Sequence, residues 1–142
     1  MIILDTDIVS LLDRREGDAY ENIVARLAHP DASEVCTTIV TFEEQLRGWL
    51  STIASARSPV QQVRAYGRLH RLLRAYQLRP VIDFDDAAVK RFAELRRTVR
   101  IGTMDLRIAS IALTHGALLV TRNLVDFRQV PELQVEDWSI SP

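Results

Sequence analysis

Acidic side chains recur in this sequence where a run of apolar residues ends. They are Asp5 after Met-Ile-Ile-Leu, Glu43 and Glu44 after Thr-Ile-Val-Thr-Phe, Asp105 in Ile-Gly-Thr-Met-Asp, and Asp126 in Thr-Arg-Asn-Leu-Val-Asp-Phe. Ligands of an open α/β sheet bind at the carboxyl ends of its strands, so acids that are distant in sequence can meet there. Unpaired carboxylates repel one another, and a divalent cation relieves that repulsion. The pattern predicts metal-assisted chemistry, with phosphodiester cleavage as the leading hypothesis.

Short apolar runs alternate with amphipathic segments, and these predict the elements that carry the acids. Strands are expected at 2–4, 35–40 and 118–121, with a short edge strand at 133–135. Helices are expected at 6–15, 20–27, 42–56, 60–79, 88–95 and 103–115, and residues 30–33 are expected to form a loop. The alternation predicts one α/β domain over residues 1–142, in which helices cover both faces of a mostly parallel sheet of four to five strands.

Polar residues at the predicted helix starts suggest how each helix is capped. The candidate N-caps are Thr6 or Asp7, Thr41, Asp83 or Asp85, and Thr103. Thr41 and Glu44 also match a capping-box pattern, which gives Glu44 a structural role that is compatible with a catalytic one.

Composition excludes some classes of protein but does not indicate a particular function. The net charge is −1, and the single cysteine, Cys36, excludes an internal disulfide framework. No apolar run is long enough to span a bilayer, and the chain starts without a basic, signal-like segment, so we expect a cytoplasmic protein with no membrane partner.

Arginines are concentrated in the second quarter of the chain. Residues 45–82 contain seven arginines and no acid. Arg64, Arg68 and Arg71 fall on one face of the helix predicted there. Arginine suits bidentate contacts to phosphate, which makes these residues candidates for RNA binding. A codon bias toward arginine explains the composition equally well, and both interpretations stay open.

Four segments in order resemble the PIN-domain family, and most of all the VapC-type ribonuclease toxins of toxin–antitoxin pairs. The segments are Leu-Asp-Thr-Asp-Ile, Ile-Val-Thr-Phe-Glu-Glu-Gln-Leu-Arg-Gly, Ile-Gly-Thr-Met-Asp-Leu-Arg-Ile-Ala, and Leu-Val-Thr-Arg-Asn-Leu-Val-Asp-Phe. Their order and spacing, and the total length, agree with the family over nearly the whole chain. The resemblance implies a three-layer α/β/α PIN-like domain.

The resemblance also implies a site and an activity. The four catalytic and metal-binding acids would be Asp5, Glu44, Asp105 and Asp126, and spacing selects Glu44 over Glu43. Supporting positions would be Thr6, Asp7, Thr121 and Asn123, with Arg122 as a further candidate for RNA binding. The expected activity is a Mg²⁺- or Mn²⁺-dependent endoribonuclease that cleaves loops of structured RNA such as tRNA or rRNA.

Two partners besides RNA are expected, the first from the resemblance and the second from the general frequency of symmetric dimers. One is a cognate antitoxin, expected to lay an apolar helix in a groove near Leu11, Leu12 and Trp49. The other is a second copy of the chain, because closed two-fold dimers are the commonest assembly.

Two alternatives compete with this interpretation. Asp5-Thr6-Asp7 after an apolar strand also fits haloacid-dehalogenase-like phosphatases, in which Asp5 would be the nucleophile and Asp7 the acid/base. Such an enzyme needs a lysine near the phosphoryl group, and Lys90 is the only lysine in the chain. The second alternative is an RNA-binding PIN-like domain without catalytic activity.

Overall fold

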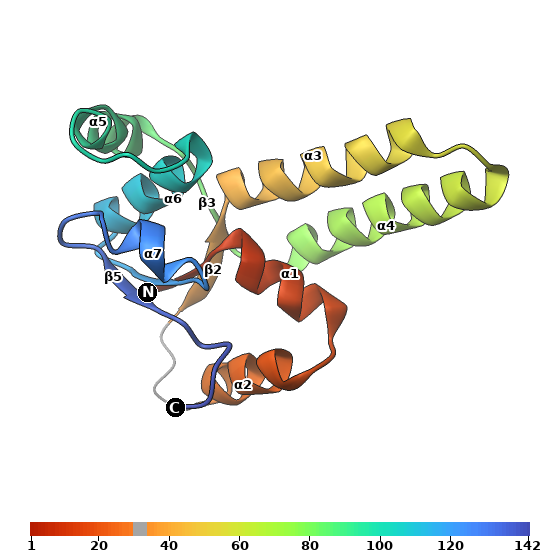
Figure 1. Ribbon diagram of the computed structural model, residues 1–142, viewed down its shortest axis with the longest axis horizontal. Coiled ribbons are helices and arrows are strands. Elements are labelled where there is room, and N and C mark those ends of the chain that lie inside the picture. Colours follow the sequence, from red (N-terminus) through yellow and green to blue (C-terminus); the bar gives the residue numbers. More distant parts are fainter. Residues whose placement is uncertain (30–33) are drawn as a thin grey trace.

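A single parallel sheet forms the centre of the computed structural model (Figure 1). The order of its strands is β3-β2-β1-β4-β5. Its strands are β1 (Ile2–Leu4), β2 (Val35–Thr38), β3 (Val81–Ile82), β4 (Leu118–Val120) and β5 (Gln134–Glu136). The structure describes residues 1–29 and 34–142, so the loop predicted at 30–33 lies outside the described residues. The expected mostly parallel sheet of four to five strands is confirmed, because all five strands found in those ranges pair in parallel.

Helices cover both faces of this sheet, as the predicted three-layer architecture requires. They are α1 (Thr6–Arg14), α2 (Asp18–Leu27), α3 (Ile39–Ser55), α4 (Pro59–Leu78), α5 (Asp86–Leu95), α6 (Thr103–Thr114) and the short α7 (Leu124–Phe127). Successive strand residues point to opposite faces. Ile3 accordingly packs with the residues of α5 and α6, whereas Ile2 and Leu4 pack with those of α1 and α2. The nearly all-apolar α6 is buried, as its sequence predicts.

Helices α3 and α4 form an antiparallel hairpin that extends away from the sheet (Figure 1). Only Ala65 and Leu72 are buried on α4, although the helix is 20 residues long. Three residues of its predicted apolar face are largely exposed: Val63 (74%), Tyr66 (59%) and Leu73 (55%). The hairpin therefore presents apolar surface that the rest of the described chain does not cover.

Three predicted N-caps are wrong: the helix starts at Thr6 and Thr103 are as predicted, but α3 begins at Ile39 and not at Phe42. The second strand ends at Thr38, whose extended backbone and side chain cap α3 by accepting a hydrogen bond from the Thr41 amide. Thr41 is therefore inside the helix and buried, and the capping box with Glu44 does not form. Helix α1 is capped by Asp5, not by Thr6 or Asp7, and α6 by Gly102, not by Thr103.

Other expectations drawn from the sequence have mixed outcomes in the structure. Asp85 caps α5, as one of the two alternatives predicts. Cys36 is a buried free thiol in β2. Asp126, expected in a loop, lies instead in α7, a single turn capped by Asn123. No helix in the described part of the chain is both long and apolar enough to cross a membrane.

Candidate active site

The predicted acids lie on segments that meet where the strand order reverses. Strand β1 lies at the centre of the sheet, with β2 on one side and β4 on the other, and Leu4 is in register with Val120. Asp5 and Thr121 are the next residues after these strands, and the Asp5 amide donates to the Val120 carbonyl at 2.9 Å. Divergence of the connections at such a switch point opens the carboxyl edge of a parallel sheet to ligands.

Asp5 is the most buried of these acids, with 5% of its surface exposed. Its Oδ1 accepts a hydrogen bond from the Thr6 amide at 2.7 Å, and its Oδ2 accepts one from the Thr121 hydroxyl at 2.7 Å. Burial, followed by repulsion from Asp7, raises the pKa of Asp5 to about 7, although both hydrogen bonds oppose the rise. The site therefore holds a carboxyl group that is close to its titration point at neutral pH.

Glu44 reaches the same region from the second turn of α3. Its Oε1 accepts a hydrogen bond from the Thr6 hydroxyl at 3.0 Å, and that hydroxyl lies 3.2 Å from the hydroxyl of Thr41. Burial raises the pKa of Glu44, and repulsion from Asp105 adds to the rise. Glu43 instead pairs with Arg47 one turn along the helix. The contact with Thr6 supports the choice of Glu44 over its neighbour.

Asn123 connects the two remaining acids. Its Nδ2 donates to Asp126 Oδ2 at 2.9 Å and lies 3.3 Å from Asp105 Oδ2. The backbone amide of Asn123 donates a hydrogen bond to the Thr121 hydroxyl at 3.0 Å, and this hydroxyl in turn donates to Asp5. Burial and then repulsion from Asp126 raise the pKa of Asp105. We call Asp5, Glu44, Asp105 and Asp126 the acidic cluster.

Asp7 lies beside the acidic cluster and influences most of it. Its negative charge contributes to the raised pKa values of Asp5, Glu44 and Asp105. Asp7 Oδ2 accepts a hydrogen bond from the Arg122 amide at 3.0 Å, whereas its Oδ1 is buried and has no hydrogen-bond partner among the described residues. Leaving a carboxylate oxygen in this state is unfavourable. A bound cation would relieve both the unpaired oxygen and the mutual repulsion.

The donor atoms in this region suit a hard cation. Carboxylate and amide oxygens are the ligands that Mg²⁺ and Mn²⁺ prefer. Within residues 1–29 and 34–142, however, no three acidic, histidine or cysteine side chains are already gathered as a metal-ligand group. The carboxylates are close enough to raise one another's pKa but are not arranged as a rigid cage. Binding a cation would therefore require side-chain rotation toward a common centre.

The predicted RNA-binding arginines are spread over different parts of the molecule. Arg122 lies on the exposed loop between β4 and α7, next to Asn123. Arg64, Arg68 and Arg71 are exposed along α4, where the Arg68 guanidinium lies 5.3 Å from the centroid of the Trp49 ring. Among the described residues, no hydrogen bond or ion pair joins this trio to the acidic cluster.

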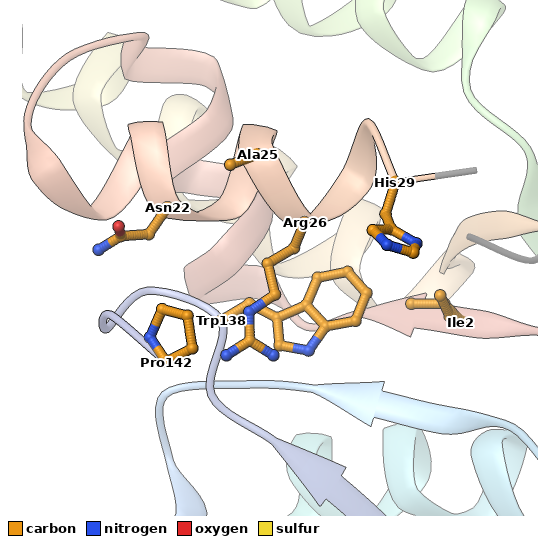
Figure 2. A pocket seen from close by; sticks show the side chains of 7 residues that line it. All are labelled: Ile2, Asn22, Ala25, Arg26, His29, Trp138 and Pro142. Carbon is orange, nitrogen blue, oxygen red and sulfur yellow. The ribbon is translucent and has the colours of Figure 1, made fainter. Parts of the chain in front are cut away.

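Two cavities lie away from the acidic cluster. One, of about 420 Å³, lies between α2 and the C-terminal segment, where the Arg26 guanidinium sits over the Trp138 ring (Figure 2). The other, of about 440 Å³, lies between α3 and α4 and is lined by Phe42, Leu46, Tyr66, Leu69, His70, Leu72 and Leu73. We call this second cavity the hairpin groove.

Sequence reasoning overlooked one residue that adjoins the site. Gln45 follows Glu44 directly, and its side-chain amide contacts α1 and α4. The only signal in the sequence is a polar residue next to Glu44 in the predicted helix. The partners of Gln45 lie 31 to 35 positions away in the chain, beyond the reach of any local pattern.

Lys90 does not support the phosphatase alternative. It is exposed on α5, in the layer of helices that flanks the sheet, and not at a strand end. A haloacid-dehalogenase-like enzyme needs its lysine beside the nucleophilic aspartate, and Asp5 has no lysine among the neighbours described above. The geometry therefore leaves this alternative without one of its essential groups.

Comparison with known proteins agrees with the geometry. A model of the PIN domain family matches residues 2–133. The chain is 30% identical over 141 residues to Ribonuclease VapC2 of Rickettsia felis, covering 96% of each protein. It is 26% identical over 113 residues to the tRNA(fMet)-specific endonuclease VapC of Salmonella typhimurium, covering 76% of this chain and 78% of that protein.

Solved structures give the same result. The structure of VapBC2 from Rickettsia felis bound to a DNA fragment from their promoter contains a chain that superposes with a TM-score of 0.73 at 27% identity, covering 97% of this chain and 99% of that one. A chain in the DNA-bound VapBC structure from Salmonella typhimurium superposes with a TM-score of 0.71 at 25% identity, covering 96% and 97%. The fold, the family match and the relatives together show that this chain belongs to the PIN domain family.

Proposed function

We propose that this chain is a divalent-metal-dependent endoribonuclease and the toxin of a toxin–antitoxin pair, with the acidic cluster as its catalytic centre. One observation carries the proposal: four acids from four separate segments converge at the switch point of a PIN fold. The relatives named above are ribonucleases, which supports RNA as the substrate. Metal dependence is supported by the oxygen donors and by the unrelieved repulsion among them.

Each protein group in the site has a chemical task in this proposal. When bound, Mg²⁺ or Mn²⁺ supplies an activated water and neutralises charge on the phosphate that is attacked. Asp5, held by Thr121, and Glu44, held by Thr6, would provide ligands, as would Asp105 and Asp126, which Asn123 joins.

Contacts to the RNA would come from the surrounding arginines. Arg122 adjoins the acidic cluster and would position the phosphate beside the cleaved bond. Arg64, Arg68 and Arg71 would contact the backbone farther along the strand. The substrate is a loop of structured RNA, such as tRNA or rRNA, since unstacked bases in loops are open to a protein. One relative is named as specific for tRNA(fMet), which supports tRNA as the first candidate.

The partner would be a cognate antitoxin, as two structural neighbours are VapBC assemblies. The sequence predicts an apolar groove near Leu11, Leu12 and Trp49, but Leu11 is buried, at 9% exposure, and cannot line such a surface. The hairpin groove, with the exposed apolar residues of α4 beside it, offers a better docking site for an apolar antitoxin helix. A homodimer of the toxin is also part of the proposal.

Expression in cells tests this function directly. Induction of the wild-type chain should arrest growth and produce discrete new RNA ends, whereas Asp5→Asn should do neither. Purified protein should cut the same RNA with Mg²⁺ and stop when EDTA is added. RNA binding without cleavage at any metal concentration would favour the alternative of an RNA-binding domain without catalytic activity. Harmless expression with intact RNA would overturn the toxin assignment.

A further inference from the structure

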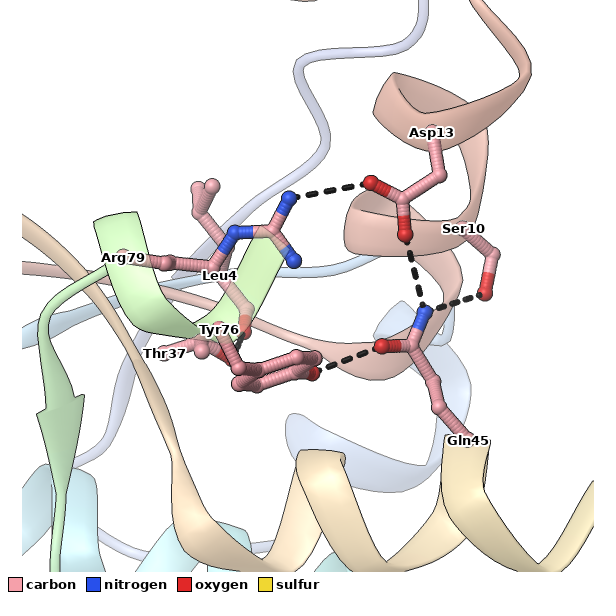
Figure 3. A network of polar contacts seen from close by, with 7 residues as sticks. All are labelled: Leu4, Ser10, Asp13, Thr37, Gln45, Tyr76 and Arg79. Atoms are coloured by element: carbon pink, nitrogen blue, oxygen red, sulfur yellow. Dashed lines mark hydrogen bonds and ion pairs between the residues drawn. The ribbon is translucent and has the colours of Figure 1, made fainter. Parts of the chain in front are cut away.

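A polar network beside Glu44 links the three helices α1, α3 and α4. The Gln45 side-chain amide lies at its centre, with Nε2 3.4 Å from Ser10 Oγ and 3.3 Å from Asp13 Oδ2 (Figure 3). On the other side of the amide, the Tyr76 hydroxyl donates to Gln45 Oε1 at 2.6 Å. Gln45 thus joins α1 to α4 through α3.

Arg79 closes the network from the end of α4. Its guanidinium pairs with Asp13 Oδ1 at 2.9 Å and lies 5.2 Å from the centroid of the Tyr76 ring. The other terminal nitrogen of Arg79 is buried without a hydrogen-bond partner in the described structure. Arg79 thus leaves one buried donor unpaired, which is unfavourable, while it contacts both Asp13 and Tyr76.

The position of the network relative to the acidic cluster suggests its task. Helices α1 and α3 are joined at two levels: Thr6 contacts Glu44 at the site, and Ser10 and Asp13 contact Gln45 farther along α1. Thr6 follows Asp5, and Glu44 precedes Gln45. The contacts of Gln45 with Ser10 and Asp13 therefore limit how far α1, which follows Asp5, can move from the turn of α3 that carries Glu44.

Repulsion between the two helices makes their separation important. Asp7 of α1 repels Glu44 of α3, and Asp105 repels both Asp5 and Glu44. A joint between α1 and α3 opposes their divergence. The aromatic contact between Phe42 and Tyr76, with centroids 4.8 Å apart, fixes the ring whose hydroxyl completes the joint.

We infer that Gln45 and Tyr76 are positioning residues that hold the turn of α3 carrying Glu44 against the start of α1 after Asp5, so that both carboxylates can turn toward one divalent cation. Within the described residues, neither side chain hydrogen-bonds to the acidic cluster. The ion pair between Asp13 and Arg79 adds a further contact by joining the C-terminal ends of α1 and α4. The inference rests on the proposed metal-dependent function, because it concerns the ligands of that metal.

Mn²⁺ binding followed by electron paramagnetic resonance tests the inference without using activity. Tyr76→Phe keeps the ring but removes the donated hydrogen bond, and Gln45→Leu removes all three hydrogen bonds of the Gln45 side chain. Removal of one hydrogen bond corresponds to a change of about two- to tenfold in an equilibrium constant. Tyr76→Phe should weaken Mn²⁺ binding within about that range, and Gln45→Leu should weaken it at least as much. Tyr20→Phe on α2 is the matched control and should bind as the wild type does.

A second measurement separates positioning from simple stabilisation. RNA cleavage by Tyr76→Phe should need about two- to tenfold more Mg²⁺ for half-maximal rate, yet approach the wild-type rate at saturating Mg²⁺. Unchanged Mn²⁺ affinity in both variants would overturn the inference, even if their melting temperatures fell. Absence of Mn²⁺ binding by the wild-type protein would instead overturn the proposed function, and the inference with it.

Discussion

The hydroxyl of Thr121 donates a 2.7 Å hydrogen bond to Oδ2 of Asp5, joining residues that are 116 positions apart at the ends of two neighbouring strands. Thr121 is fully buried and Asp5 almost so. The bond lowers the pKa of Asp5 against the larger effect of burial. Thr121 therefore favours the ionised form of Asp5, which is the form that can ligate a cation.

Replacing this threonine should reduce activity without disturbing the fold. Thr121→Val keeps the shape but removes the donor, so the pKa of Asp5 should rise further above about 7. Hydrogen bonds to charged groups contribute about 1.5–3 kcal/mol, which corresponds to a roughly ten- to hundredfold lower cleavage rate at pH 7. Raising the pH should recover part of this activity. Thr52→Val, which removes a hydroxyl bonded to the Gly48 carbonyl of its own helix, is the control and should cleave normally.

Asp5 should also control how stability depends on pH. Its pKa of about 7 lies above the ordinary value of 3.8, so between these values the folded protein holds a proton that the unfolded chain has released. Stability in EDTA should therefore fall as pH rises across this window. Asp5→Asn should flatten this fall and, because a pKa unit corresponds to about 1.4 kcal/mol, stabilise the metal-free protein at pH 8 by about 1–3 kcal/mol.

Denaturant unfolding of both proteins at pH 5 and pH 8 checks this sign. The Glu44 and Asp105 carboxyls also have raised pKa values, so a smaller slope should persist in the variant. The same substitution should abolish RNA cleavage. A variant that is less stable than the wild type at pH 8 in EDTA would contradict the account of Asp5 as a buried carboxyl under repulsion.

The adjacent glutamates should differ sharply in effect. Glu44 accepts a hydrogen bond from Thr6 beside Asp5, whereas Glu43 pairs with Arg47 on the outer part of the helix. Glu44→Gln should reduce the cleavage rate by roughly a hundredfold or more, since it removes a charge from the metal site. Glu43→Gln should change the rate less than about twofold, because exposed ion pairs contribute little. Single-turnover cleavage at fixed Mg²⁺ compares them, and the opposite order would exchange their assigned roles.

The role of the α4 arginines should be visible in how RNA binding depends on salt concentration. If Arg64, Arg68 and Arg71 neutralise phosphates, replacing all three with Gln should weaken RNA binding. The slope of log K against log salt should then become shallower by about 0.7 for each phosphate that is no longer neutralised. Cleavage of a very short substrate should change little, because it would not reach α4. Fluorescence anisotropy over a range of salt concentrations measures the slope.

A control of equal charge makes that result interpretable. Gln substitutions at Arg14, Arg15 and Arg91 also remove three positive charges, but from α1, its C-cap and α5. If the slope falls equally in both triple variants, the effect reflects net charge alone. An unchanged slope in the α4 variant would assign its arginines to a protein contact instead.

Local sequence determined most of the elements and the choice of candidate site residues. Alternating apolar and amphipathic stretches predict β1, β2, β4 and the six long helices, because strand and helix periodicities are set by neighbouring residues. The acids at strand ends predict the acidic cluster, since the ends of parallel strands share one edge. Motif spacing selects Glu44 over Glu43 and places Asn123 beside Asp126, and the hydrogen bonds described above agree with both choices.

Only the tertiary structure decided what depends on partners distant in the chain. Ile39 and Val40 are β-branched and favour a strand, but the cap made by Thr38 starts a helix there, with Thr41 buried beside Thr6 of α1. The exposed face of α4 could not be told from a buried one, because periodicity shows that a face is apolar and not what covers it. The joint made by Gln45 and Tyr76 needs three helices in contact, and no local pattern specifies that. The raised pKa of Asp5 likewise follows from burial and neighbouring charge, both of which exist only after the chain has folded.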